Sequence, residues 1–134
     1  LKLKVSVNMI EFLLLFVAIT LLIIIIPLVS TYQIVKSIIH QDYRGLVVWF
    51  YGTARAIDIL GNVISANMFN DILIKSKGYR FGRRGETLSS VIGKNHRDNT
   101  LTWTGSVIRK TLDSIDTNHT LKSILSDEEI NRRK

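Results

Sequence analysis

The hydrophobic positions are distributed unevenly along the chain. Residues 12–35 contain no charged side chain, and residues 13–29 are almost wholly apolar. A helix rises about 1.5 Å per residue, so about 20 apolar residues cross a hydrocarbon layer of about 30 Å. The pattern therefore predicts a transmembrane helix over residues 10–30, with Pro27 near its end and a short flank, residues 1–9, before it.

Two other interpretations of this stretch are a cleaved signal peptide and a buried helix of a soluble protein. The apolar run of a signal peptide is usually about 7–15 residues long and is followed by small residues at the cleavage site. Here the run is longer, and Ser30-Thr31-Tyr32-Gln33 follows it. We therefore expect a retained, single-pass anchor.

The distribution of cations around this helix predicts its orientation. Lys2 and Lys4 precede it, whereas Lys36, Arg44 and Arg55 follow it, and residues 75–134 carry thirteen basic against seven acidic side chains. Cytoplasmic flanks are enriched in Lys and Arg. We expect the N-terminus outside and the C-terminal part in the cytoplasm, at a bacterial inner membrane.

Residues 31–52 are expected to form a juxtamembrane or interfacial segment. The apolar and aromatic run 46–51 is too short to cross a bilayer as a helix, and Arg55 and Asp58 follow almost at once. Trp49 and Tyr51 suit either the headgroup region or a small soluble core.

A second helical pattern covers residues 53–74. Apolar side chains recur at helical spacing at Ile57, Leu60, Ile64 and Met68. The opposing polar stripe comprises Arg55, Asp58, Asn62 and Ser65. The more common outcome for such a stripe is a solvated face. The alternative is a network of Arg55, Asp58 and Asn62 that is buried against another helix or another copy of the chain.

A basic, glycine-containing segment follows and predicts a loop. It contains no acidic residue, and its five cations are Lys75, Lys77, Arg80, Arg83 and Arg84. They could be solvated, contact anionic lipid, or bind nucleic-acid phosphates while Tyr79 and Phe81 stack on bases. Of the two ligands, lipid is favoured because the anchor keeps the loop near a membrane.

The remaining segments predict short helices. Glu86 or Thr87 could begin a helix that Gly93 ends, and a helix over 103–116 could be capped by Thr104 or Ser106. Ser126 and Glu129 have the spacing of a capping box within a flexible charged tail, residues 125–134. The fold class expected is all-α, with the transmembrane helix followed by a small basic helical domain, residues 53–124, that is cytoplasmic and partly membrane-associated.

Residues that could carry chemistry form no recognisable site. The 134 residues include no cysteine, which excludes disulfides and thiolate zinc sites. A phosphate-binding loop ending at Gly93-Lys94 fails, because Leu88 stands where glycine is needed and Asn95 replaces Ser or Thr. No nucleophile elbow surrounds Ser89 that could pair it with His119 in a hydrolase site, and His96 and His119 lack the paired spacing of metal ligands. We expect no catalytic residues, no cofactor and no metal, and hence not an enzyme.

The order of these features resembles that of small membrane proteins encoded by tailed phages and prophages. The resemblance covers about residues 55–124 and includes the segment Gly85-Glu86-Thr87-Leu88-Ser89-Ser90 and a late Asp-x-x-x-His; a Cys commonly follows that His, whereas Thr120 stands here. The residues expected to form a structural or interaction motif are Arg55, Asp58, Asn62, Gly85, Glu86, Thr87, Ser89, Ser90, Gly93 and His119.

The resemblance implies a phage or prophage origin. The function expected is non-enzymatic, through self-association or contact with a host or phage membrane protein, for example in lysis control or superinfection exclusion. The alternative is a membrane-tethered protein that binds nucleic acid or anionic lipid through residues 75–84. The bilayer itself is the partner common to both.

Overall fold

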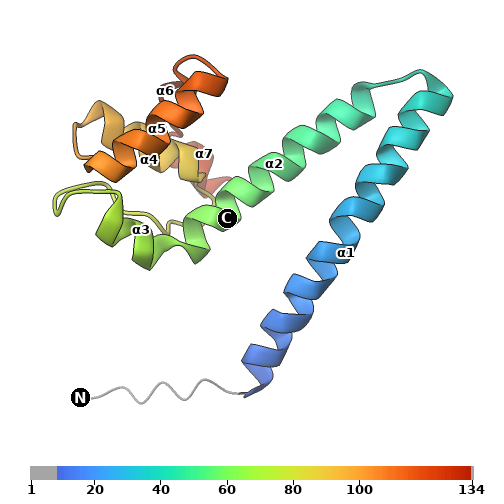
Figure 1. Ribbon diagram of the computed structural model, residues 1–134, viewed down its shortest axis with the longest axis horizontal. Helices are drawn as coiled ribbons and strands as arrows, with labels where there is room; N and C mark the ends of the chain where they lie inside the picture. The colour runs from blue at the N-terminus through green and yellow to red at the C-terminus, as the bar shows by residue number, and fades with distance from the viewer. Residues whose placement is uncertain (1–8, 134) are drawn as a thin grey trace. The chain divides into compact units, whose positions relative to one another are not determined.

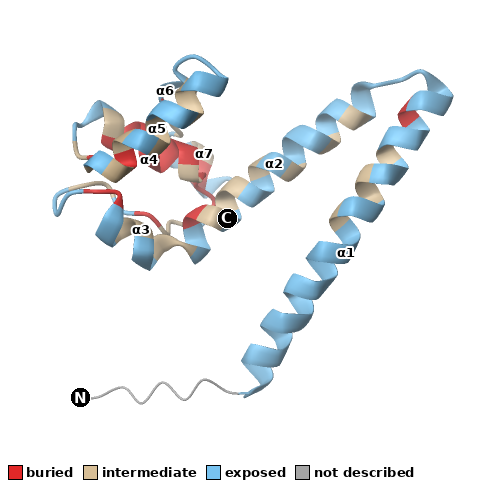
Figure 2. Cartoon of the chain, in the orientation of Figure 1, coloured by how far each residue is buried: buried red, intermediate tan, exposed pale blue. Residues whose placement is uncertain are grey.

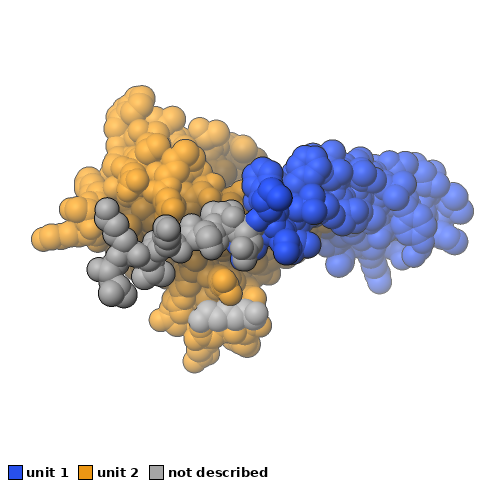
Figure 3. All heavy atoms as spheres, turned by 90° about the horizontal axis from the view of Figure 1, so that it is seen from below, with its two compact units in different colours: residues 1–50 blue, residues 51–134 orange. Residues whose placement is uncertain are grey.

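The described part of the chain, residues 9–133 of a computed structural model, is all-α (Figure 1). It contains seven helices and no β-strand, as the sequence predicts. The chain divides into two compact units, Leu1–Phe50 and Tyr51–Lys134 (Figure 3).

Helix α1, Met9–His40, is ten residues longer at its C-terminal end than the predicted span. Pro27 lies inside it and does not end it. Two hydroxyls next to the proline donate to carbonyls one turn back, from Ser30 to Ile26 at 2.6 Å and from Thr31 to Pro27 at 2.9 Å. Such bonds satisfy backbone groups where a proline disturbs the helix. The helix ends before Gln41, whose φ of 50° is left-handed.

The apolar side chains of α1 are exposed. Its most apolar 18-residue stretch is 0% buried, which distinguishes it from the core helix of a soluble domain. Among residues 9–133, α1 is the one helix that is long and apolar enough to cross a bilayer. This is the helix that the hydrophobic pattern predicts.

Helices α2, Arg44–Ile64, and α3, Ala66–Ile72, lie where the end of the juxtamembrane segment and a single helix over residues 53–74 are predicted. Helix α2 begins well before residue 53 because the Asp42 carboxylate accepts the Arg44 amide at 3.0 Å. This bond satisfies one of the amides left unpaired at a helix start. The predicted helix 53–74 is otherwise present, with a break at Ser65 between α2 and α3.

Helix α4, Leu88–Arg97, lies at the centre of the second unit, and every residue from 89 to 95 is buried (Figure 2). Neighbouring helices are α5, Trp103–Ile115, and α6, His119–Lys122, which contact α4 and one another. The apolar core of this unit comprises Leu73, Ile74, Phe81, Val91, Ile92 and Leu101. An isolated bridge between Ile74 and Leu101 ties the end of α3 to the start of α5.

The prediction that Gly93 ends a helix is wrong, because α4 continues to Arg97. Thr87 is its N-cap, as expected, and its hydroxyl accepts the Ser90 amide at 3.2 Å. A Cβ atom at Gly93 would lie 2.0 Å from the carbonyl oxygen of Thr120. The glycine therefore allows α4 and α6 to approach closely rather than stopping a helix.

Two expectations about the distal helices are corrected. The cap of α5 is Thr102, whose hydroxyl accepts the Gly105 amide at 3.1 Å, instead of Thr104 or Ser106. The segment after residue 125 is not simply a flexible tail, because it forms α7, Asp127–Asn131, with the predicted capping box. Ile130 is 0% exposed, and burial of this side chain fixes the helix against the domain.

We expect Gly93→Ala to lower the free energy of unfolding by about 1–3 kcal/mol or more, because the added methyl group overlaps the Thr120 carbonyl. Gly61→Ala is the matched control, since a Cβ there meets nothing within 4 Å and alanine favours a helix by up to about 1 kcal/mol. Urea unfolding in detergent micelles measures both. Equal effects of the two substitutions would contradict the close contact between α4 and α6.

Candidate functional site

A buried carboxylate lies at the centre of the second unit. Glu86 is 0% exposed and precedes the N-cap of α4. Its Oε1 accepts from Ser90 Oγ at 2.8 Å and lies 2.6 Å from Lys94 Nζ, and its Oε2 accepts from the Tyr79 hydroxyl at 2.9 Å. Ser90 and Lys94 are four residues apart on one side of α4, and Glu86 lies just before the start of that helix.

Lys94 neutralises this carboxylate. Its side chain is 10% exposed, and its ammonium lies 4.3 Å from the centre of the Tyr79 ring. A buried charge is tolerated when an opposite charge and hydrogen bonds compensate it. Here the ion pair, the Ser90 hydroxyl and the Tyr79 ring and hydroxyl provide that compensation.

Asn62 of α2 holds the turn that leads into Glu86. It is 0% exposed, and its amide nitrogen donates to the carbonyls of Arg83, at 3.0 Å, and Glu86, at 2.9 Å. Its amide oxygen accepts from Gly82 at 2.9 Å. The turn contains Gly82 and Gly85 with φ of 107° and 81°, values that side chains disfavour.

Asp58, one turn before Asn62, contacts the start of α4. Its carboxylate accepts the Ser89 amide at 3.3 Å, where a negative charge is favoured by the helix dipole. Arg55 is half-buried on the same helix and lies 5.8 Å from the Tyr51 ring. A solvated face is therefore wrong for Asn62, which is buried, and for Asp58, which is half-buried. Their hydrogen-bond partners are the turn 82–86 and the first residues of α4, not the predicted network with Arg55.

A second buried amide, Asn95, joins the basic segment to α4. Its oxygen accepts from the Tyr79 amide at 2.8 Å and from the Thr100 hydroxyl at 2.6 Å. Its nitrogen donates to the carbonyls of Tyr79, at 2.7 Å, and Val91, at 2.9 Å. Asn95, Lys94 and the Tyr79 hydroxyl are members of this network that were not predicted. The four-residue spacing from Glu86 to Ser90 and to Lys94 is the sequence signal that could have indicated Lys94.

His119 lies elsewhere in the unit. Its Nδ1 is 3.3 Å from Asp116, and its backbone carbonyl accepts from the Ser123 hydroxyl at 2.7 Å. The neighbouring Thr120 donates from both its amide and its hydroxyl to Asp113, at 2.9 and 3.0 Å. Asp113, at the end of α5, thus fixes the start of α6.

The pKa of Asp113 reflects opposing effects. Burial disfavours the charged carboxylate, but the hydrogen bonds from Thr120 and Arg109 outweigh burial and hold the pKa below its ordinary value. In the capping box of α7, the Ser126 amide and hydroxyl lower the pKa of Glu129, and Arg55 adds to this effect. Both carboxylates therefore stabilise the fold in their ionised form.

The aromatic rings of the basic segment bear on one of its three interpretations, the binding of nucleic-acid bases. Phe81 is only 5% exposed and packs edge-on against Phe69, with ring centres 5.5 Å apart. Tyr79 is held by Glu86. The prediction that Phe81 stacks on a nucleic-acid base is therefore wrong, because its side chain belongs to the core.

The five cations of this segment have different surroundings. Arg83 pairs with Asp127 and donates to the Tyr79 hydroxyl, and the bonds to Tyr79 and Asp127 raise its pKa. Lys75 donates to the Asn99 carbonyl at 2.9 Å. Lys77, Arg80 and Arg84 are exposed. Arg83 thus holds α7 to the segment, whereas the other four cations, Lys75 included, are exposed.

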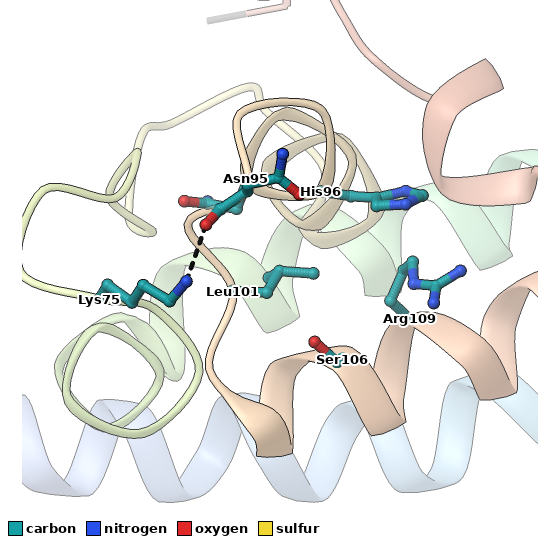
Figure 4. A pocket seen from close by; sticks show the side chains of 7 residues that line it. Lys75, Asn95, His96, Leu101, Ser106 and Arg109 are labelled. Atoms are coloured by element: carbon teal, nitrogen blue, oxygen red, sulfur yellow. Dashed lines mark hydrogen bonds between the residues drawn. The ribbon is translucent and has the colours of Figure 1, made fainter.

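A polar pocket of about 320 Å³ lies between the end of α4 and the first turns of α5 (Figure 4). Its lining includes Lys75, His96, Ser106 and Arg109, and no carboxylate. The Nδ1 atom of His96 is buried without a hydrogen-bond partner. The lining residues could hold a small anion, although Arg109 is already paired with Asp113 at 3.1 Å. Among residues 9–133, no group of three or more His, Cys, Asp or Glu side chains could hold a metal ion.

These features define an all-α protein with one long, exposed apolar helix and a compact helical unit built around a buried Glu–Lys pair. Compared with models of protein families, with curated proteins and with solved structures, the chain matches none.

We expect Lys94→Met to lower the free energy of unfolding by about 3–5 kcal/mol, because Glu86 would remain buried without its counter-charge. The double variant Glu86→Gln/Lys94→Met should recover much of this loss, since no buried charge remains. Arg97→Ala, which removes the exposed pair with Asp98, should change stability little, because solvent screens that pair. Chemical unfolding of the four proteins gives the comparison, and a Lys94→Met cost as small as that of Arg97→Ala would refute the network.

The lowered pKa of Asp113 predicts a pH dependence of stability. Its contribution should be fully present above the ordinary value of 3.8 and should be lost as the pH falls through the lower folded-state pKa. Asp113→Asn should therefore be less stable than the parent near neutral pH, and the difference should shrink in acid. Unfolding curves measured over this range test the sign, and a difference that grows in acid would contradict it.

Proposed function

We propose that this chain is a small phage- or prophage-type integral membrane protein that acts without catalysis, by self-association or by contact with a membrane partner. The observation that carries the proposal is the exposure of α1. Side chains along it, such as Phe16, Ile23 and Leu28, are 63%, 68% and 67% exposed. An apolar surface of this extent is stable in lipid or against a partner, and not in water.

The length of α1 suits one crossing. Its 32 residues correspond to about 48 Å of helix, which exceeds a hydrocarbon layer of about 30 Å and leaves room for tilt or projection. The excess of cations after the helix supports an N-terminus outside and a cytoplasmic second unit. The second unit then works at the inner surface of a bacterial membrane.

The interior of the second unit supports a binding role rather than catalysis. Three groups could take part in acid–base or nucleophilic chemistry: the Glu86 carboxylate, the Lys94 ammonium and the Ser90 hydroxyl. The carboxylate is bonded to the other two in the core. Such a network stabilises one arrangement of the fold. Lysis control and superinfection exclusion are roles that a membrane-anchored binding protein of this kind performs through assembly or contact.

A second candidate function is binding of anionic lipid or nucleic acid through residues 75–84. The exposure of Lys77, Arg80 and Arg84 favours it. Burial of Phe81 removes one of the two rings expected to stack on bases, so lipid headgroups suit this surface better than nucleic acid.

Protease accessibility tests the proposed arrangement. In intact spheroplasts of cells expressing the chain, trypsin should leave the second unit uncut, and after the spheroplasts are opened it should cleave at exposed sites such as Arg80 and Arg84.

Self-association is measured in the same cells with a single Leu22→Cys substitution, because the chain has no other cysteine. Oxidation should then give a crosslinked dimer if α1 self-associates. Release of the chain by an alkaline wash would contradict anchoring.

A further inference from the structure

Helices α2 and α3 carry an exposed apolar stripe within the second unit. We use "the outer stripe" for five exposed side chains spaced three or four residues apart, a spacing that places those of one helix on the same side of that helix. They are Ile57, Leu60, Ile64, Met68 and Ile72, with exposed fractions of 52%, 44%, 72%, 53% and 46%. All five are large and apolar, and all five face away from the core of the unit.

The opposite side of α2 is polar and packed. Asp58 and Asn62 bond to the segment 82–89, and Asn62 is completely buried. A helix on the surface of a soluble protein has the reverse arrangement, with its apolar side inward. Turning the outer stripe inward would break the Asn62 and Asp58 hydrogen bonds, so the stripe needs a cover outside this unit.

We infer that the outer stripe lies on the surface of an anionic lipid bilayer, as an in-plane membrane contact additional to α1. This inference rests on the proposed membrane anchoring of the chain. Only residues 41–43 separate α1 from α2, and three residues span at most about 10 Å. A helix with one apolar and one polar side that begins beside a membrane anchor is suited to the boundary between headgroups and acyl chains.

Charge at one end of the outer stripe favours lipid over a second copy of the chain. Three exposed cations follow α3, namely Lys75, Lys77 and Arg80. The acidic residue of α3 itself is Asp71, which is also exposed. Two copies that faced each other in parallel would bring these cationic ends together, whereas anionic headgroups neutralise them.

An exposed tryptophan lies near the same end. Trp103 is 81% exposed and follows Thr102, whose hydroxyl donates to the Ile72 carbonyl at 2.7 Å. Tryptophan is enriched at the headgroup level of membranes. The stripe, the cations and this ring together match the composition of an interfacial membrane surface.

Single-cysteine spin labelling of the full chain tests the inference, since the chain contains no cysteine of its own. The substitutions are Ile64→Cys and Met68→Cys in the outer stripe, Thr111→Cys as an exposed control on α5, and Ile23→Cys in α1. The protein is reconstituted in vesicles of phosphatidylethanolamine and phosphatidylglycerol. Collisions of each label with oxygen, which concentrates in lipid, and with a water-soluble nickel chelate then report its surroundings.

Labels at 64 and 68 should show severalfold fewer collisions with nickel, and more with oxygen, than the label at 111. Protection at 23 together with an aqueous signal at 64 and 68 would overturn the inference and leave the proposed function intact. A nickel-accessible label at 23 would overturn the proposed function itself. Spin–spin broadening at 64 that disappears on dilution with unlabelled protein would assign the stripe to a second copy, and would also overturn the inference.

A separate experiment tests whether the exposed cations contribute to the contact with anionic lipid. Lys77→Glu/Arg80→Glu in the labelled chain, or vesicles of phosphatidylcholine alone, should increase nickel collisions at 64 and 68 while the label at 23 stays unchanged. Both cations are exposed, so their reversal should leave the fold intact. Equal protection in anionic and neutral vesicles would refute the role of anionic headgroups.

Discussion

The buried pair of Glu86 and Lys94 is the constraint around which the second unit is arranged. A carboxylate that is completely buried must receive a counter-charge and hydrogen bonds, and here these come from Lys94, Ser90 and Tyr79. Those three groups belong to α4 and to the basic segment, so satisfying one charge brings a loop and a helix together. Ser90 extends the network, because its hydroxyl also accepts the amide of Leu125 at 3.0 Å.

The same requirement determines how α2 is oriented. Asn62 supplies the bonds that hold the glycine turn before Glu86, and Asp58 accepts an amide at the start of α4. The polar side of α2 therefore faces the unit, and its apolar side is left outside. This arrangement agrees with the proposed anchoring by α1, since a membrane surface would cover the apolar side chains that the core does not. Stability of the interior and exposure of the outer stripe are thus two consequences of one polar network.

Several elements could be predicted from local sequence because local forces determine them. The apolar run in α1, the Thr87 cap and the Ser126–Glu129 capping box all depend on residues within a few positions. Gly93 could not be interpreted correctly, since a glycine that ends a helix and one that admits another helix look identical until Thr120 is placed beside it. Phe81 was misread for a similar reason, because its partner Phe69 is twelve positions away on another element.

The sequence by itself determined that the chain is helical, that one helix is apolar enough for a bilayer, and that cations follow it, since composition and periodicity act locally. Only the tertiary structure decided which polar residues are buried. Glu86, Asn62 and Asn95 resemble ordinary surface residues in the sequence, and each is 0% exposed. The physical reason is that burial of a polar group depends on partners that long-range folding supplies, and no local pattern specifies those partners.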